Sequence, residues 1–317
     1  MKKVVAGVDI GGTNTVFGIV DTEGKVLSEG HLKTTDYPEV KDFVIALGAG
    51  VKKLLAGKND LELIGIGIGA PDANYHRGTI EHAPNLTWKG IVPLGDLVKK
   101  ELNVQVAVTN DANAAAMGEM VFGGAKGMKN FIILTLGTGL GSGIVVDGKL
   151  VYGHTGFAGE VGHLCVVPGG RECGCGRKGC LETYASATGL VKTVSLMISE
   201  MRADSPLRDL PPSKLTSKAI AEAAASGDPI ALKAMEYTAE KLGLGIINSI
   251  VYTSPEAIFL FGGLANAGEL LFKPVREYLK KNNYILFKDT VLILPSGIPE
   301  SNGAVLGSAA LILNDLN

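Results

Sequence analysis

Two glycine-rich turns of similar design lie 126 residues apart in this chain. The segment Asp9–Thr13 aligns without a gap with Thr135–Gly139, and Ile19–Asp21 aligns in the same way with Val145–Asp147. Both copies read as a strand, a Gly/Thr turn, a second strand and an acidic turn. The repeat predicts two similar α/β domains; the alternative is that any two hairpins with glycine turns look alike.

The rest of the sequence alternates between strand and helix patterns. With 317 residues, 46% of them hydrophobic, the chain is long enough for about two domains with their own cores. Its 43 glycines stand in short clusters, which indicates tight turns and close backbone approaches. A proline-rich segment at 202–213 is predicted to be a connecting loop. Strands are expected at 4–10, 15–21, 25–30, 63–69, 105–109, 131–136, 142–147, 258–261 and 291–294, and helices at 39–55, 94–102, 112–121, 217–225, 229–251, 269–281 and 302–313.

Composition excludes several classes of protein. The 30 Lys and Arg nearly balance the 32 Asp and Glu, which argues against a general nucleic-acid binder. The N-terminus runs straight into a strand with no signal-peptide cleavage site. Residues 131–146 are uncharged but contain four glycines, which fits two strands better than a membrane helix. Four cysteines are too few for a disulfide scaffold, so a cytoplasmic enzyme is expected.

The first glycine turn carries a carboxylate, Asp9, followed by Gly11-Gly12-Thr13-Asn14. Exposed N–H groups in such a turn can face phosphate oxygens, and Asp9 can hold Mg²⁺ directly or through water. Alone, the pattern favours phosphate binding and a plain hairpin equally. The second turn, Gly137-Thr138-Gly139, favours phosphate binding, because two such loops can clamp one nucleotide. The counterpart of Asp9 is Thr135, so only the first copy can bind a metal directly.

Asp111 stands between a predicted strand and a predicted helix. From local sequence it is most simply a helix N-cap. The same place also suits a general base, since a helix N-terminus favours an ionised carboxylate and ligands bind at the carboxyl ends of parallel strands. The neighbouring Asn110 could orient a hydroxyl group.

A metal site is predicted from one histidine and three cysteines. One imidazole and three thiolates satisfy a closed tetrahedral Zn²⁺ site, whose role is structural. The alternative is four unpaired side chains or a disulfide. Cys165, in an apolar run, is predicted to be a small buried hydrophobe. The four predicted ligands are His163, Cys173, Cys175 and Cys180.

Further polar and aromatic residues have two interpretations each. Glu160 and Glu182, close to the metal ligands, either contact a polyhydroxylated ligand or are solvated. Asn85 and Trp88 lie in a loop that could bind sugar, although Trp88 could equally be a core anchor.

A predicted strand ends in the double glycine Gly262-Gly263. The pair either packs a flat ring against the backbone or forms a strand-to-helix turn.

The motifs at 9–14, 136–143, 159–163 and 173–182 together resemble the ROK family (repressors, open reading frames and sugar kinases), closest to its bacterial glucokinases. The resemblance covers essentially the whole chain. It implies an α/β, two-domain actin/hexokinase-like (ribonuclease H-like, duplicated) fold with an interdomain active-site cleft. The implied N-terminal domain is 1–118 plus about 301–317, and about 119–300 forms a C-terminal domain with the zinc loop.

The resemblance also implies roles for residues. Asp111 matches the catalytic base for the sugar 6-hydroxyl. The implied ligands are a sugar and ATP with catalytic Mg²⁺. A structural Zn²⁺ is implied as well, with His163 among its ligands. The implied sugar contacts are Asn85, Asn110, Asp111, Glu160, His163 and Glu182. The implied nucleotide and magnesium contacts are Asp9, Gly11, Gly12, Thr13, Asn14, Gly137, Thr138, Gly139, Gly262 and Gly263.

The leading hypothesis is ATP-dependent phosphorylation of a hexose, with D-glucose favoured, in carbohydrate metabolism and glycolysis. The alternatives are a kinase for N-acetylglucosamine, N-acetylmannosamine or fructose, a sugar-sensing regulator without turnover, and an actin-like or chaperone ATPase. Asp72, where many relatives have Gly, and the insert 74–79 put the sugar preference in question. The phosphate motif begins at residue 9, leaving no room for a helix-turn-helix. We expect no nucleic-acid or membrane partner, and a homo-oligomer with a dimer favoured.

Overall fold

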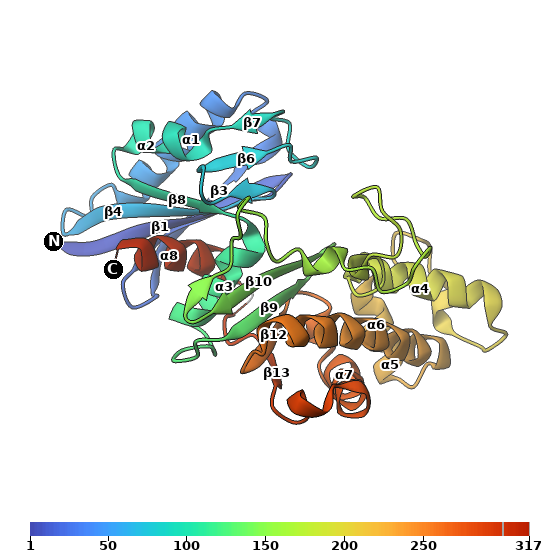
Figure 1. Cartoon of the computed structure of the whole chain (residues 1–317). Helices are drawn as coiled ribbons and strands as arrows, with labels where there is room; N and C mark the ends of the chain where they lie inside the picture. The colour runs from blue at the N-terminus through green and yellow to red at the C-terminus, as the bar shows by residue number, and fades with distance from the viewer. Residues whose placement is uncertain (300, 317) are drawn as a thin grey trace. The chain divides into compact units, whose positions relative to one another are not determined.

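The chain forms two α/β units (Figure 1). Unit 1 consists of Met1–Met128, Lys149–Ala158 and Ser296–Asn317, and unit 2 of Lys129–Gly148 and Gly159–Pro295. The computed structural model describes residues 1–299 and 301–316. Glu300 and Asn317, which the predicted domain boundaries include, lie outside the described residues. The expected domains, 1–118 plus about 301–317 and about 119–300, stay a prediction, because compactness of a unit does not show that it folds alone.

The sheet of unit 1 has the strand order β3-β2-β1-β4-β8, with β1 antiparallel to β2 and parallel to β4. Alternation along β1 divides its side chains between two clusters: Val4 and Val8 pack with helices α1 and α2, and Val5 packs with α8. The elements are β1 (Lys2–Ile10), β2 (Asn14–Asp21), β3 (Val26–Lys33), α1 (Val40–Leu55), β4 (Leu61–Gly69), α2 (Leu94–Leu102), β8 (Gln105–Thr109), α3 (Asp111–Val121) and α8 (Gly303–Leu316).

The last helix, α8, lies directly on β1 and β4, as Figure 1 shows with α8 in red beside the blue strands. Two glycines permit this approach. A Cβ added at Gly67 would stand 1.7 Å from the backbone oxygen of Ser308, and one at Gly7 would stand 2.0 Å from that of Val305. Sheet and helix backbones are therefore in contact here, which confirms that some glycines mark close backbone approaches.

The second sheet repeats this design, with the order β11-β10-β9-β12-β13. The pair β9–β10 is antiparallel, and β12 and β13 follow in parallel. The predicted duplication is confirmed by this topology. Helices α4 to α7 form a core with Ile132 and Leu134. The elements are β9 (Phe131–Leu136), β10 (Leu140–Val146), β11 (Lys149–Leu150), α4 (Ala187–Glu200), α5 (Ser217–Ala225), α6 (Pro229–Thr253), β12 (Ala257–Phe261), α7 (Glu269–Asn282) and β13 (Leu292–Pro295).

A small third sheet, β5 (Ala73–Asn74), β6 (Thr79–Glu81) and β7 (Ile91–Val92), contains the insert as a hairpin. The Tyr75 ring stacks on that of Tyr152, with centroids 4.2 Å apart and planes within 2°. The Asn74 amide donates to the backbone oxygen of Thr155 at 2.9 Å. These contacts hold the segment Lys149–Ala158 against the insert within unit 1.

Every predicted strand and helix is present, with ends shifted by a few residues at most. Helix α4 was not predicted, because its sequence mixes helix formers with β-branched residues and Gly189. Its start is a regular N-cap, in which the Ser186 hydroxyl accepts from the Gly189 N–H. The segment 202–213 is irregular apart from one 3-10 turn, Pro206–Asp209. Among the described residues, no helix has both the length and the apolar character needed to cross a bilayer.

Candidate active site

The first glycine turn joins β1 to β2 in unit 1. Asp9 lies at the end of β1, paired with Val16, and the Gly11 N–H donates to the Asn14 oxygen at 2.9 Å. A Cβ at Gly12 would stand 2.6 Å from the backbone oxygen of Asn85. The structure therefore brings the predicted phosphate turn and the predicted sugar residue Asn85 together, and a side chain at position 12 would separate them.

Two carboxyl groups influence each other beside this turn. Burial, together with the negative charge of Asp111, raises the pKa of Asp9 to about 6. The surrounding protein also raises the pKa of Asp111, while the N–H groups of Ala112 and of Asp111 itself act in the opposite direction. The Asp111 side chain still reaches solvent. Two repelling carboxylates of this kind favour a bound cation, and Mg²⁺ prefers such oxygen ligands.

The start of α3 corrects one expectation. The N-cap is Asn110, whose Oδ1 accepts from the Asn113 N–H at 2.7 Å. Asp111 is the first helical residue, and its Oδ1 accepts from the Ala112 N–H at 2.8 Å. Asp111 is therefore not the cap, because its neighbour satisfies that helix end, and its exposed carboxylate lies in the first turn, where the helix dipole favours a negative charge.

Trp88 is a core anchor. Its side chain is 4% exposed, its ring packs on Phe43 with centroids 4.7 Å apart, and its Nε1 donates to the Tyr37 oxygen at 3.0 Å. Trp88 is thus unavailable for stacking on a sugar, whereas Asn85 in the same loop is exposed.

The second glycine turn joins β9 to β10 in unit 2. It is held to the start of α4, because the Ala187 N–H donates to the Gly137 oxygen at 2.9 Å and the Thr188 hydroxyl to the Thr138 oxygen at 2.7 Å. A Cβ at Gly137 would meet open space, whereas one at Gly139 would stand 2.6 Å from Glu182 Oε2.

The double glycine after β12 lies beside this second turn. The Leu264 N–H donates to the Leu136 oxygen at 3.1 Å, and Gly262 has a φ of 96°, which favours glycine. A Cβ on Gly263 would meet open space. The second glycine turn and the double glycine, both predicted nucleotide contacts, are therefore neighbours within unit 2.

The four predicted metal ligands converge. One ligand atom from each of them lies within 4.8 Å of all the others. Cys175 Sγ and Cys180 Sγ are 3.7 Å apart, and Cys173 Sγ and His163 Nδ1 are 3.6 Å apart. Tetrahedral Zn²⁺ with Zn–S bonds of about 2.3 Å requires S···S separations of roughly 3.8 Å. The residues present therefore fit a structural Cys₃His zinc site.

Cys165 corrects another expectation. It is exposed, although the apolar run around it predicted a buried side chain, and it does not belong to the ligand cluster. Cys165 forms an isolated antiparallel bridge with Cys180, which is buried.

Glu182 connects the metal loop to the second turn. Its Oε1 accepts from Cys173 Sγ at 3.2 Å and its Oε2 from the Leu140 N–H at 3.3 Å. Glu160, which is exposed, starts the 3-10 turn that ends at His163. The structure therefore places Glu160, His163 and Glu182 on one small framework within unit 2.

Sequence reasoning missed the residues that hold this framework. The Ser142 hydroxyl donates to the Gly159 oxygen and accepts from the Val161 N–H at 3.2 Å, on either side of Glu160. Arg171 stacks on Tyr184 and donates to the Thr183 oxygen at 2.8 Å. The only local signal for Ser142 was one small hydroxyl residue between two glycines.

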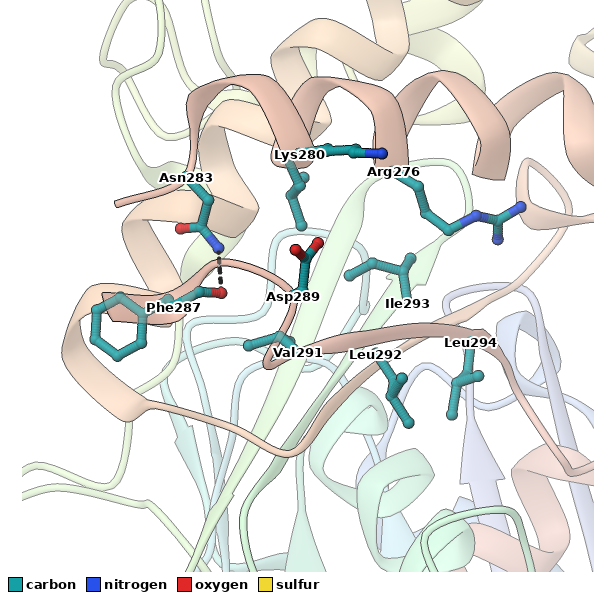
Figure 2. Close-up of a pocket in the computed structure, with 10 residues that line it drawn as sticks. Arg276, Lys280, Asn283, Phe287, Asp289, Val291, Leu292, Ile293 and Leu294 are labelled. Carbon is teal, nitrogen blue, oxygen red and sulfur yellow. Dashed lines mark hydrogen bonds between the residues drawn. The ribbon is translucent and has the colours of Figure 1, made fainter. Parts of the chain in front are cut away.

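Figure 2 shows a separate hollow of unit 2 between α7 and β13. Its polar groups are two cations and one carboxylate, and the Asn283 amide donates to the Phe287 oxygen at 3.0 Å. It contains no predicted site residue, so the candidate chemistry lies elsewhere. The lining residues are Arg276, Leu279, Lys280, Asn283, Phe287, Asp289, Val291, Leu292, Ile293 and Leu294.

Comparison with known proteins shows the family to which the chain belongs. The model of the ROK family matches residues 5–315. A glucokinase of Halalkalibacterium halodurans is 38% identical over 279 residues, 86% of this chain and 84% of that protein. A ROK family glucokinase from Streptomyces griseus, solved in complex with glucose and AMPPNP, is 34% identical with a TM-score of 0.79, covering 97% of this chain and 98% of that one. A xylose repressor of Caldicellulosiruptor bescii is 34% identical over 255 residues, 80% of this chain and 63% of that protein.

Proposed function

Since this chain belongs to the ROK family and is an enzyme of its hexokinase class, we propose that it transfers the γ-phosphoryl group of ATP to the 6-hydroxyl of D-glucose. The observation that carries the proposal is the pair Asp9 and Asp111, whose charges interact beside the first glycine turn. The names of the glucokinase relatives support glucose as the acceptor.

Asp111 is the proposed general base. As the sugar oxygen attacks phosphorus, one carboxylate oxygen accepts the hydroxyl proton. The N–H of Ala112 holds Oδ1, so Oδ2 is the oxygen that faces the substrate. Because the surrounding protein raises the pKa of Asp111, its carboxylate is a stronger base near neutral pH than an ordinary aspartate.

The sugar-binding assignment rests on polar groups already held in place. The Asn110 oxygen is used by the helix cap, so its amide NH₂ is the group that donates to a sugar hydroxyl. The Leu140 N–H orients Glu182 through Oε2. The proposed contacts are Asn85, Asn110, Asp111, Glu160, His163 and Glu182.

The nucleotide is proposed to bind through backbone N–H groups of both glycine turns, with its ring against Gly262-Gly263. Asp9, with Asn14 and Thr13 beside it, is the proposed magnesium contact. Bound Mg²⁺ neutralises charge that develops on the phosphate oxygens. In the first turn the proposed contacts are Gly11 and Gly12, and in the second they are Gly137, Thr138 and Gly139.

Structural zinc at His163, Cys173, Cys175 and Cys180 completes the proposal. The zinc ion would fix the loop that carries His163 and Glu182, so these two proposed sugar contacts would stay ordered. As a glucokinase, the protein would begin glycolysis in the cytoplasm, without nucleic-acid or membrane partners, and a homodimer is the favoured assembly.

Two alternatives concern the same site. Asp72, with a φ of 51°, and the hairpin 74–79 would permit another sugar such as N-acetylglucosamine, N-acetylmannosamine or fructose. The similarity to a xylose repressor favours a sugar-sensing regulator as the second candidate. Such a regulator needs no base at position 111.

The test is ADP release with Mg-ATP and a panel of glucose, mannose, fructose, N-acetylglucosamine and N-acetylmannosamine, with Asp111→Asn as the catalytic blank. We expect release with glucose far above the rate without sugar. Release with only another sugar would keep the mechanism and change the substrate. Calorimetric binding of glucose without release of ADP would favour the regulator.

A further inference from the structure

Cys165 and Cys180 face each other across an isolated antiparallel bridge. The flanking hydrogen bonds run from the Leu181 N–H to the Leu164 oxygen at 2.8 Å and from the Val166 N–H to the Gly179 oxygen at 2.9 Å. Because the two cysteines exchange no backbone bonds themselves, they form a non-hydrogen-bonded pair. In such pairs the Cα atoms are about 4.5 Å apart and the side chains share one face.

The thiol of Cys165 points along its neighbour strand. A Cβ on Gly179 would stand 3.3 Å from Cys165 Sγ, and Cys165 Sγ lies 3.7 Å from the Lys178 oxygen. Gly179, with a φ of 81°, adds no side chain beside this thiol, which can therefore rotate toward Cys180. A disulfide needs Cβ atoms about 3.5–4.5 Å apart, a spacing that a directly opposed pair provides.

We propose that Cys165 and Cys180 form a reversible disulfide when a hydroperoxide oxidises the protein, and that this bond removes one thiolate from the Cys₃His zinc site. The inference rests on the zinc site of the proposed function and adds a modification site to it. Cys165 is exposed and outside the ligand set, whereas Cys180 is buried. Cys175 is exposed as well, but the proposed zinc holds its thiolate, so Cys165 is the exposed thiol that is free to react with peroxide.

The chemistry balances in two steps. The Cys165 sulfur attacks one peroxide oxygen, the O–O bond breaks, and sulfenic acid and water form. The Cys180 thiolate then attacks the sulfenic sulfur, the S–O bond breaks, and the departing hydroxide takes a proton from solvent. Together, two thiols and one hydrogen peroxide give one disulfide and two waters.

Loss of Cys180 leaves three ligands, which no longer close a structural site. Glu182 lies two residues further along the chain and contacts Cys173. Oxidation is therefore expected to release zinc and to disturb a proposed sugar contact at the same time.

The experiment treats the zinc-loaded protein with equimolar hydrogen peroxide and follows zinc release with a chromogenic chelator. Trypsin then separates the thiols, because Cys165 lies in residues 150–171, Cys173 and Cys175 in 172–177, and Cys180 in 179–192. We expect the 150–171 and 179–192 peptides to be linked, and dithiothreitol with added zinc to reverse the change.

Cys165→Ser is the matched variant, since it retains all four predicted ligands. It should bind zinc as the parent does and release it at least about tenfold more slowly under peroxide; Cys165→Ala repeats the test if serine alters zinc content. Equal release rates, or a link between 172–177 and 179–192 instead, would overturn the proposal. Neither readout uses kinase activity, so failure of the proposed function would appear separately, in ADP release.

Discussion

The two sheets have the same strand order but different side chains at equivalent places. Asp9 at the end of β1 corresponds to Thr135 at the end of β9. After β8 the chain continues with Asn110-Asp111, whereas after β13 it continues with Ser296-Gly297. Ser296 and Gly297 donate to the buried carboxylate of Glu119 at 2.8 and 2.6 Å. The same topology therefore carries two carboxyl side chains at these strand ends in the first copy, and a threonine and hydrogen bonds to Glu119 in the second.

The sheets also differ in how closely a helix approaches. Gly7 and Gly67 pair in register in the first sheet, where α8 lies against them. Their counterparts in the second sheet are Ile133 and Phe259, which also pair in register and are buried. A duplicated backbone thus accommodates two packing arrangements, because side-chain volume and not topology sets the distance between layers.

The largest expected effect comes from adding a methyl group where α8 contacts the first sheet. Gly67→Ala places a methyl group on the Ser308 backbone oxygen, and a backbone cannot yield as a side chain does. We expect the unfolding free energy of unit 1 to fall by more than about 3 kcal/mol, measured by urea denaturation. Gly174→Ala, where the added Cβ meets open space, is the control; equal midpoints would refute the close packing.

The next effect concerns the acid after β8. Asp111→Asn should keep sugar binding while turnover falls at least ~10²-fold, because the amide cannot accept the hydroxyl proton. Asp147→Asn is the matched control: Asp147 is exposed and its φ of 51° is one that asparagine also adopts. Near-normal turnover by Asp111→Asn in the ADP-release assay would remove Asp111 from the role of base.

The metal loop lies in unit 2, so loss of a ligand there should affect the proposed sugar contacts of that unit. Loss of a residue that only hydrogen-bonds to a metal ligand costs roughly 10–100-fold in metal affinity, so loss of the ligand itself in Cys175→Ser should cost more. The variant should also have weaker sugar affinity and lower thermal stability. Cys165→Ser, outside the cluster, should retain zinc. Full sugar affinity in zinc-free protein would contradict the link between the metal and Glu182.

The smallest effect concerns Asp9. Its pKa is raised from 3.8 to about 6 by burial and by Asp111, so the fold favours the protonated form, and ionisation destabilises the protein as pH rises through 6. Asp9→Asn should therefore raise the unfolding free energy at pH 8 by at most about 3 kcal/mol, measured as a higher melting temperature. Below pH 4 the melting temperature should be unchanged.

The same charge is needed for magnesium. Wild-type activity should decline as pH falls below about 6, when Asp9 takes up its proton, and Asp9→Asn should require more Mg²⁺ at every pH. Thr135→Val, at the equivalent position of the second sheet, should not change the Mg²⁺ requirement. An unaltered requirement in Asp9→Asn, measured by magnesium titration of ADP release, would show that the acid at β1 does not hold the ion.

The sequence alone determined the features that depend on short spacings. The strands Gln105–Thr109 and Phe131–Leu136 have the bounds that their apolar patterns predict. The four metal ligands converge as their spacing predicts, because a few residues of loop can reach one ion in only a few ways.

Only the tertiary structure decided which of these side chains are buried. Trp88 is buried because Phe43 and Tyr37, far away in sequence, surround it. Cys165 is exposed although its partner in an isolated bridge, Cys180, is buried. A local pattern states what a side chain prefers, whereas its burial and partners depend on segments that only the folded chain brings into contact.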